Sequence, residues 1–155
     1  MSASPPVAVA ALNERFLLDY PLEAAREIEA MPAQDAAGVL AAAAPRAVVR
    51  AWQALAPDIA AEVLGRLPAQ LAAHVLTEAQ AAASTAVLAQ LDTEERTRQL
   101  DRLDPQIGQE LLELLAYPED SAGRMMDPRV SPLRAGVSVG EALARLRSLQ
   151  RPGRR

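Results

Sequence analysis

Residues 45–67, PRAVVRAWQALAPDIAAEVLGRL, contain two consecutive copies of one short pattern and decide the fold class. Each copy opens with a proline, Pro45 or Pro57, and carries a large apolar residue seven positions later, Trp52 or Leu64. A further apolar residue stands four positions before each of these two, and another stands three positions after it. This is the i, i+4, i+7 spacing of one helix face. The stretch therefore predicts two short amphipathic helices with a connection between them.

The same spacing continues in both directions along the chain. Large apolar residues, which we call the ladder positions, recur every twelve residues: Phe16, Ile28, Leu40, Trp52, Leu64, Leu76, Leu88, Leu100 and Leu112. A twelve-residue unit holds about two turns of helix and a connection, so no unit is stable unless its apolar stripe packs on neighbouring helices. A fixed period with one helix per unit is typical of a solenoid.

We therefore predict an all-α fold, a superhelical solenoid of about nine or ten short helices with a twelve-residue period. Prolines between the apolar stripes are expected at first helical positions, where no hydrogen bond is lost. These prolines are Pro32, Pro45, Pro57, Pro68 and Pro105. The expected helices lie near residues 8–19, 22–31, 33–43, 46–56, 58–67, 69–79, 81–91, 93–103 and 105–116.

Composition narrows the possible classes of protein. Half of the 155 residues are apolar and only 3% are aromatic, which predicts a core of Ala, Leu and Val. The net charge is −4 and all 16 basic residues are arginine, and we predict no nucleic-acid surface from this pattern. Cysteine is absent, which is compatible with a reducing cytosol. The longest charge-free run, Ala79–Leu91, is far shorter than the roughly 20 apolar residues that a bilayer requires, so we predict no membrane span.

The sequence contains no recognisable catalytic motif. His74 is the only histidine and has no cysteine or second histidine to complete a transition-metal site. Ser84 and Thr85 are not surrounded by a glycine elbow. We therefore predict that the chain is not an enzyme.

The repeat ends after residue 116. The tract Tyr117–Met126 reads YPEDSAGRMM, and we expect Asp120 or Ser121 to act there as a hinge or a cap before Gly123. Further on, Val130 and Leu133 suggest a short extended segment, and Ser138 is placed to cap a helix running from Val139 to about Leu149. We therefore divide the chain into a helical superhelix at residues 1–116, a connector at residues 117–128, and a strand-helix segment with a basic tail at residues 129–155.

A superhelix of short helices that ends in YPEDSAGRMM resembles the intracellular N-terminal domain of the MgtE family of magnesium transporters. In that family the domain leads through such a tract into a pair of CBS domains, and residues 126–149 look like the opening strand and helix of the first one. The resemblance implies a cytoplasmic domain at the inner face of the membrane. Its partners would be the CBS domains or the transmembrane domain of an MgtE-like transporter, with homodimer formation through such a partner.

The resemblance also implies a weak, regulatory Mg²⁺ site formed by acidic residues. Carried over by position, the family's acids fall on Glu62, within Ala60–Leu64, and on Glu94; a third falls on Arg98. The positive charge of Arg98 is expected to weaken or abolish that part of the site. Glu62 is equally explained as an exposed helix residue, and Glu94 as an acid that complements a helix N-terminus.

Two functional hypotheses follow. In the first, the chain is a cytosolic regulatory domain that senses Mg²⁺ for an MgtE-like transport system and cannot itself transport, because the pore is absent. In the second, it is a helical-repeat scaffold without metal dependence, similar to the flagellar motor protein FliG or to a degenerate MgtE N domain.

Overall fold

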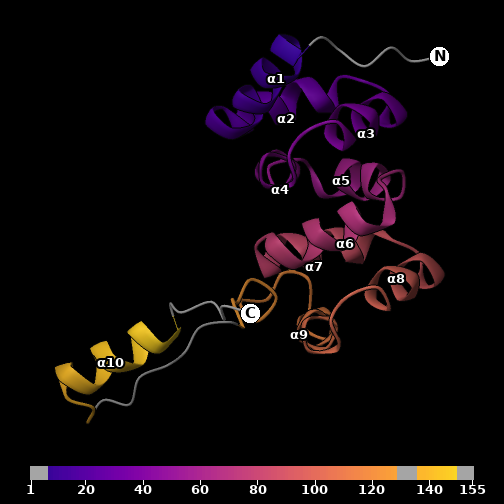
Figure 1. Ribbon diagram of the computed structural model, residues 1–155. Coiled ribbons are helices and arrows are strands. Elements are labelled where there is room, and N and C mark those ends of the chain that lie inside the picture. Colours follow the sequence, from indigo (N-terminus) through magenta and orange to yellow (C-terminus); the bar gives the residue numbers. More distant parts are fainter. Residues whose placement is uncertain (1–6, 129–135, 150–155) are drawn as a thin grey trace.

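The computed structural model describes residues 7–128 and 136–149 of the chain. Within these ranges it contains ten α-helices and no strand (Figure 1). The helices are α1 (Val7–Asp19), α2 (Pro21–Glu29), α3 (Ala33–Ala41), α4 (Pro45–Trp52), α5 (Pro57–Leu64), α6 (Ala69–Glu78), α7 (Ala81–Gln90), α8 (Thr93–Leu100), α9 (Pro105–Leu115) and α10 (Val139–Leu149). The prediction of an all-α chain of short helices is confirmed, and the predicted helices match α1 to α9 to within a few residues.

Successive helices from α2 to α9 begin twelve residues apart, at Pro21, Ala33, Pro45, Pro57, Ala69, Ala81, Thr93 and Pro105. A proline at the first helical position loses no hydrogen bond, because the first N–H groups of a helix have no partner within it. Pro32 and Pro68, which we expected at first helical positions, instead stand one residue earlier, as the N-caps of α3 and α6. Their backbones are extended there, with ψ of 139° and 137°, which proline also adopts.

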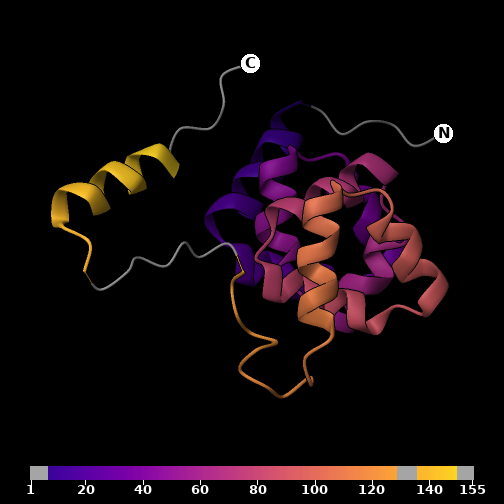
Figure 2. The same ribbon diagram turned by 90° about the horizontal axis from the view of Figure 1, so that it is seen from below.

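Helices two places apart in the chain pack against each other. The even-numbered helices α2, α4 and α6 pack one on the next, and so do α3, α5, α7 and α9. Figure 1 shows the helices stacked in chain order from α1 to α9, and Figure 2 shows α9 lying across the end of the stack. The superhelical winding that the resemblance implies remains a prediction.

The interior is built from the ladder positions and the alanines beside them. Six ladder residues are almost completely buried: Ile28, Leu40, Trp52, Leu64, Leu76 and Leu88. Small neighbours such as Ala36 and Ala60 are buried with them, so helix backbones approach closely. The predicted core of Ala, Leu and Val, with Trp52 inside it, is therefore confirmed for α2 to α7.

The ladder prediction is wrong at both ends of the stack. Phe16 and Leu112 are exposed, and each has a buried neighbour one residue away, Leu17 and Leu111. Leu100 is only partly buried but packs against the core. A step of one residue turns a side chain by about 100° around the helix. Helices near an end of the stack are covered from fewer sides, so the twelve-residue spacing does not determine which face they turn inward.

The corners between helices are held by side chains that satisfy free carbonyl groups. Ser84 Oγ donates to the carbonyl oxygen of Leu76 at 3.0 Å, and Arg96 Nε donates to that of Leu88 at 2.8 Å. Both donors are the fourth residue of their helix and reach back eight residues to the preceding helix. The last carbonyls of a helix have no partner within it, so these contacts join consecutive units.

Arg96 makes more hydrogen bonds at its corner than Ser84 does. Besides Leu88 it donates from Nη2 to the carbonyl oxygens of Ala89, at 3.4 Å, and Leu91, at 2.7 Å. One partly buried guanidinium therefore closes the end of α7 and ties α8 to it.

The connector closes the end of α9 in a similar way. Arg124 Nη1 donates to the carbonyl oxygens of Leu115, at 2.8 Å, and Tyr117, at 3.1 Å. The connector is therefore folded back on α9 by its own arginine.

A tight turn supports this arrangement. Ser121 Oγ donates to the carbonyl oxygen of Pro118 at 2.7 Å and accepts the Arg124 N–H at 3.3 Å. Gly123 lies against the ring of Tyr117, where an added Cβ would meet ring carbons at 2.4 to 2.8 Å. Asp120 and Ser121 were both considered for a hinge or a cap. Ser121 makes the two hydrogen bonds of this turn, whereas Asp120 is exposed.

The predicted helix after the connector is present as α10. Ser138 Oγ accepts the Glu141 N–H, and the Glu141 carboxylate accepts from both the Ser138 hydroxyl and the Ser138 N–H, which is a capping box. These bonds, the side-chain one first, lower the pKa of Glu141. The extended segment expected around Val130 and Leu133 lies outside the described residues.

We predict that Gly123→Ala destabilises the domain by about 1 kcal/mol, because the new methyl group displaces the half-exposed Tyr117 ring. Denaturant unfolding measures the difference. The matched control is Gly38→Ala in α3, where an added Cβ meets nothing within 4 Å; alanine should stabilise the helix there by up to about 1 kcal/mol. Equal effects of the two changes would contradict the packing of Gly123 described here.

We also predict that Arg96→Ala lowers the free energy of unfolding by about 1–2 kcal/mol, because charge-assisted hydrogen bonds at the end of α7 are lost. Arg102→Ala serves as the control, since Arg102 is exposed and its side chain makes no hydrogen bond within the described ranges. Urea unfolding of both variants gives the comparison. A loss no larger for Arg96→Ala than for the control would show that water replaces these bonds.

Candidate cation site

An acidic groove lies between α5 and the corner that joins α7 to α8. It is open to solvent and has a volume of about 410 Å³. Its walls bring together two parts of the chain that are about thirty residues apart in sequence. The lining residues are Asp58, Ala61, Glu62, Gln90, Leu91, Asp92 and Glu95.

Three of the four groove carboxylates stand at helix starts for local reasons. Asp58 lies in the first turn of α5 and Glu95 in the first turn of α8. Asp92 is the N-cap of α8 and accepts the Glu95 N–H at 2.8 Å. Acids are favoured there because the first N–H groups of a helix present partial positive charge. The groove is acidic because two helix N-terminal regions contribute to its walls.

Glu62, the first predicted ligand, is the fourth groove carboxylate. It is exposed on α5 and forms an ion pair with Arg66, 3.0 Å from Oε1 to Nη2. Arg66 also donates to the Glu62 carbonyl oxygen at 2.7 Å. A pair between exposed side chains four residues apart contributes only about 0.3–0.5 kcal/mol, so the carboxylate remains available to a stronger cation.

Glu94, the second predicted ligand, is not among the lining residues of the groove. Its side chain is 87% exposed, and Oε1 lies 2.8 Å from Arg98 Nη2. The structure therefore places Glu62 with Asp92 and Glu95, and it leaves Glu94 beside the groove.

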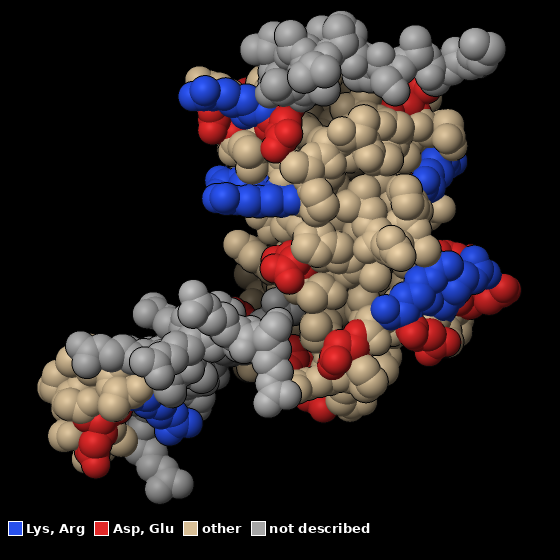
Figure 3. Space-filling model, in the orientation of Figure 1, with Lys and Arg blue, Asp and Glu red and all other residues tan. Residues whose placement is uncertain are grey.

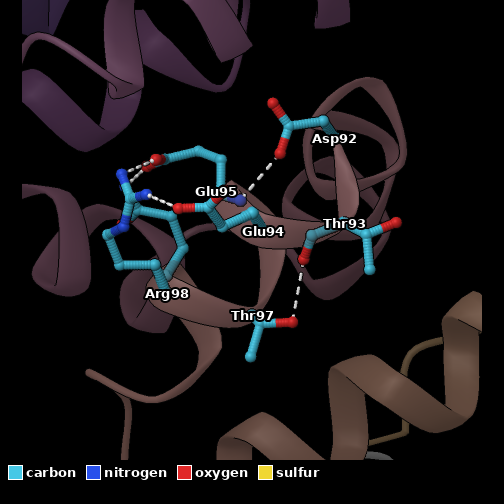
Figure 4. Close-up of polar contacts among 7 residues, drawn as sticks. Asp92, Thr93, Glu94, Glu95, Thr97 and Arg98 are labelled. Atoms are coloured by element: carbon cyan, nitrogen blue, oxygen red, sulfur yellow. Dashed lines mark hydrogen bonds and ion pairs between the residues drawn. The ribbon is translucent and has the colours of Figure 1, made fainter.

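Arg98 connects Glu94 to the groove (Figure 4). Its guanidinium pairs through Nη2 with Glu94 and through Nη1 with Glu95 Oε2. Figure 3 shows arginine and acidic side chains interleaved over the α8 region of the surface. The arginine expected to weaken the site thus neutralises carboxylates of its own helix.

Gln99 holds Glu95 from the other side. This side chain is only 2% exposed, at a position where the neighbouring units bury Val87 and Leu111, and its Nε2 donates to Glu95 Oε1 at 2.6 Å. Its own Oε1 is buried without a hydrogen-bond partner among the described residues. Such a group costs about 1–3 kcal/mol. Gln99 is therefore poorly explained by core packing and well explained by the position of Glu95.

The groove is not a preassembled metal cage. In the part of the chain that the structure describes, no group of three or more His, Cys, Asp or Glu side chains is arranged to hold a metal ion. The donor chemistry nevertheless suits Mg²⁺, which prefers oxygen ligands, keeps several waters and commonly uses only one or two carboxylates. The arrangement fits one wall of a shared site for a hydrated cation.

Asp58, Asp92 and Glu95 were not among the predicted ligands. Asp92 and Glu95 do carry a signal in the sequence, because the run Asp92-Thr93-Glu94-Glu95 is typical of an acidic helix start. Which glutamate of the pair lines the groove depends on how α8 packs beside α5, which the acidic run does not show.

The residues considered for catalysis differ in their burial. His74 is exposed, whereas Ser84 and Thr85 are completely buried. Ser84 donates to the Leu76 carbonyl oxygen, as described above. Among the described residues, no helix is both long enough and apolar enough to cross a bilayer.

Comparison with protein families agrees with the fold and with the connector. The family model of the MgtE intracellular N domain matches residues 20–120, from the residue before α2 into the connector. This family is a transporter regulatory domain and not an enzyme family, and the comparison gives no support for a CBS domain. A search of curated proteins finds no significant match. Because the match covers more than half of the chain, the protein belongs to the MgtE intracellular N domain family.

Proposed function

We propose that this domain senses Mg²⁺ and regulates an MgtE-like magnesium transport system. The observation that carries the proposal is the groove in which Glu62 from α5 and Asp92 and Glu95 from the α7–α8 corner line one open space. Family membership supports it, because the matching family is an intracellular domain of MgtE.

The physical mechanism is charge neutralisation between two acidic surfaces. The groove supplies oxygen ligands on one side, and a partner supplies the rest. When Mg²⁺ occupies the shared site, the two surfaces attract; without it, their carboxylates repel. Occupancy therefore shifts a conformational equilibrium by the difference in Mg²⁺ affinity between the two states. A site built from few carboxylates and retained waters binds weakly, as sensing in the millimolar range requires.

The proposed partners are the CBS domains or the transmembrane domain of an MgtE-like transporter, with homodimer formation through that partner. The domain would then act in the cytoplasm, at the inner face of the membrane. The stack of helices that begin every twelve residues supports a superhelical solenoid as the rigid body that carries the groove.

A protein-interaction scaffold is the alternative, and exposed apolar side chains favour it. Leu112, Tyr117, Met125 and Met126 are exposed in α9 and the connector, and Phe16, Tyr20 and Leu22 are exposed in and beside α1. Groups of exposed apolar side chains are typical of surfaces that bind other proteins. A scaffold of this kind would bind its partner equally well with and without a chelator.

A Mg²⁺ titration followed by backbone amide NMR at constant ionic strength tests the proposal. We expect saturable shifts in the low millimolar range, confined to α5 and the α7–α8 corner. The triple change Asp58→Asn, Glu62→Gln and Asp92→Asn should weaken binding at least about tenfold, because it removes three charges and keeps an N-cap acceptor at position 92.

The matched control removes three exposed acids outside the groove, by Glu23→Gln, Glu27→Gln and Glu78→Gln. It separates local binding from nonspecific screening. Equal weakening in both triple variants, or a flat titration of the natural sequence, would reject Mg²⁺ binding by this groove and favour the scaffold.

A further inference from the structure

Arg98 holds one groove carboxylate and one carboxylate outside the groove at the same time. Its Nη2 lies 2.8 Å from Glu94 Oε1, and its Nη1 donates to Glu95 Oε2. The arginine side chain is half exposed, whereas that of Glu95 is 22% exposed. The positive charge is therefore on the solvent side of the carboxylate that it neutralises.

Glu95 is anchored independently of Arg98. Its Oε1 accepts from Gln99, which is 98% buried, and its backbone N–H donates to the N-cap Asp92. If the guanidinium leaves, these two bonds still hold Glu95 at the wall of the groove. The network thus has a fixed part, Gln99–Glu95–Asp92, and a part that can be exchanged, the Arg98 guanidinium.

We propose that Arg98 is a displaceable counter-ion that sets the cation affinity of the groove. In one state the guanidinium neutralises Glu95; in the other a hydrated divalent cation takes its place and Arg98 turns into solvent. Every cation that binds must then release Arg98, so the arginine raises the concentration at which the groove fills. This inference rests on the proposed function, because it assigns the regulation of the same site.

The other arginine near the groove does not have this arrangement. Arg66 pairs with Glu62 and also donates to a carbonyl oxygen of its own helix. Among the described residues, Glu62 has no buried anchor comparable to Gln99. The exchange is therefore assigned to Arg98, where the carboxylate stays in place without its arginine.

The test is a Mg²⁺ titration of the full chain and of Arg98→Gln, at constant ionic strength, with amide NMR shifts as the readout. Loss of a positive charge beside a divalent ion should tighten apparent binding about 3- to 10-fold at a partly exposed site. Arg98→Lys keeps the positive charge beside the groove, so its apparent Mg²⁺ affinity should remain within about twofold of that of the natural chain. Arg102→Gln removes an equal charge outside the network and should change affinity little.

A second readout follows the guanidinium itself. In the natural chain the side-chain Nε–H signal of Arg98 should move toward that of a solvated arginine as Mg²⁺ is added, and it should not move with NaCl at the same ionic strength. This measurement does not depend on a substituted protein.

The outcomes separate the two proposals. If the natural chain binds Mg²⁺ but Arg98→Gln and Arg102→Gln behave alike, the counter-ion role is overturned and the sensing function stands. If only Arg98→Gln binds, the counter-ion role is supported and sensing by the natural groove fails. If neither binds, or if the Arg98 signal stays unchanged while the groove fills, the counter-ion role is rejected.

Discussion

The structure depends on the packing of helices that are too short to be stable alone. Each of α2 to α9 has only 8 to 11 residues, and isolated helices of that length are marginal in water. Apart from α8, each of them packs an apolar face on the helix two places along the chain, and their stability must come from these contacts. Alanines such as Ala36 and Ala60 allow this close contact. Every other feature, including the groove, is carried by this stack.

Short helices create a second constraint, because each one leaves unpaired carbonyl groups at a corner. The chain meets it with side chains from the next unit: Ser84 at the end of α6, Arg96 at the end of α7 and Arg124 at the end of α9. These bonds orient successive helices relative to one another. The contacts of Arg96 are especially relevant to the groove, because they tie α8, which carries Glu95, to the end of α7.

The groove combines stability and function in the same residues. Asp92 starts α8 and also lines the groove, so its charge has a structural purpose even if no cation binds. Gln99 is different, since a buried amide with an unpartnered oxygen weakens the core. Its contact with Glu95 suggests that stability is given up there to hold a carboxylate at the surface. Arg66 and Arg98 reduce the repulsion that the collected acids would otherwise produce.

Much of the fold was predictable from local patterns. Helix lengths and boundaries arise from interactions within a few residues, so local patterns report them directly. These patterns are the spacing of Ile28 to Leu88, the prolines and the acidic start at Asp92. Ser138 likewise identified the start of α10. The ladder was wrong at Phe16 and Leu112, where the helices at the two ends of the stack turn a neighbouring residue inward.

The site was less predictable than the fold, because it depends on contacts between residues that are far apart in the sequence. The sequence by itself determined the number and length of the helices, the composition of the core and the acidic character of the helix starts, since these depend on contacts between near neighbours. Only the tertiary structure decided that Glu62 shares a groove with Asp92 and Glu95, and that Glu94 is outside it with Arg98 pairing the two glutamates. That choice depends on contacts between residues about thirty positions apart, which neither local spacing nor the twelve-residue period contains.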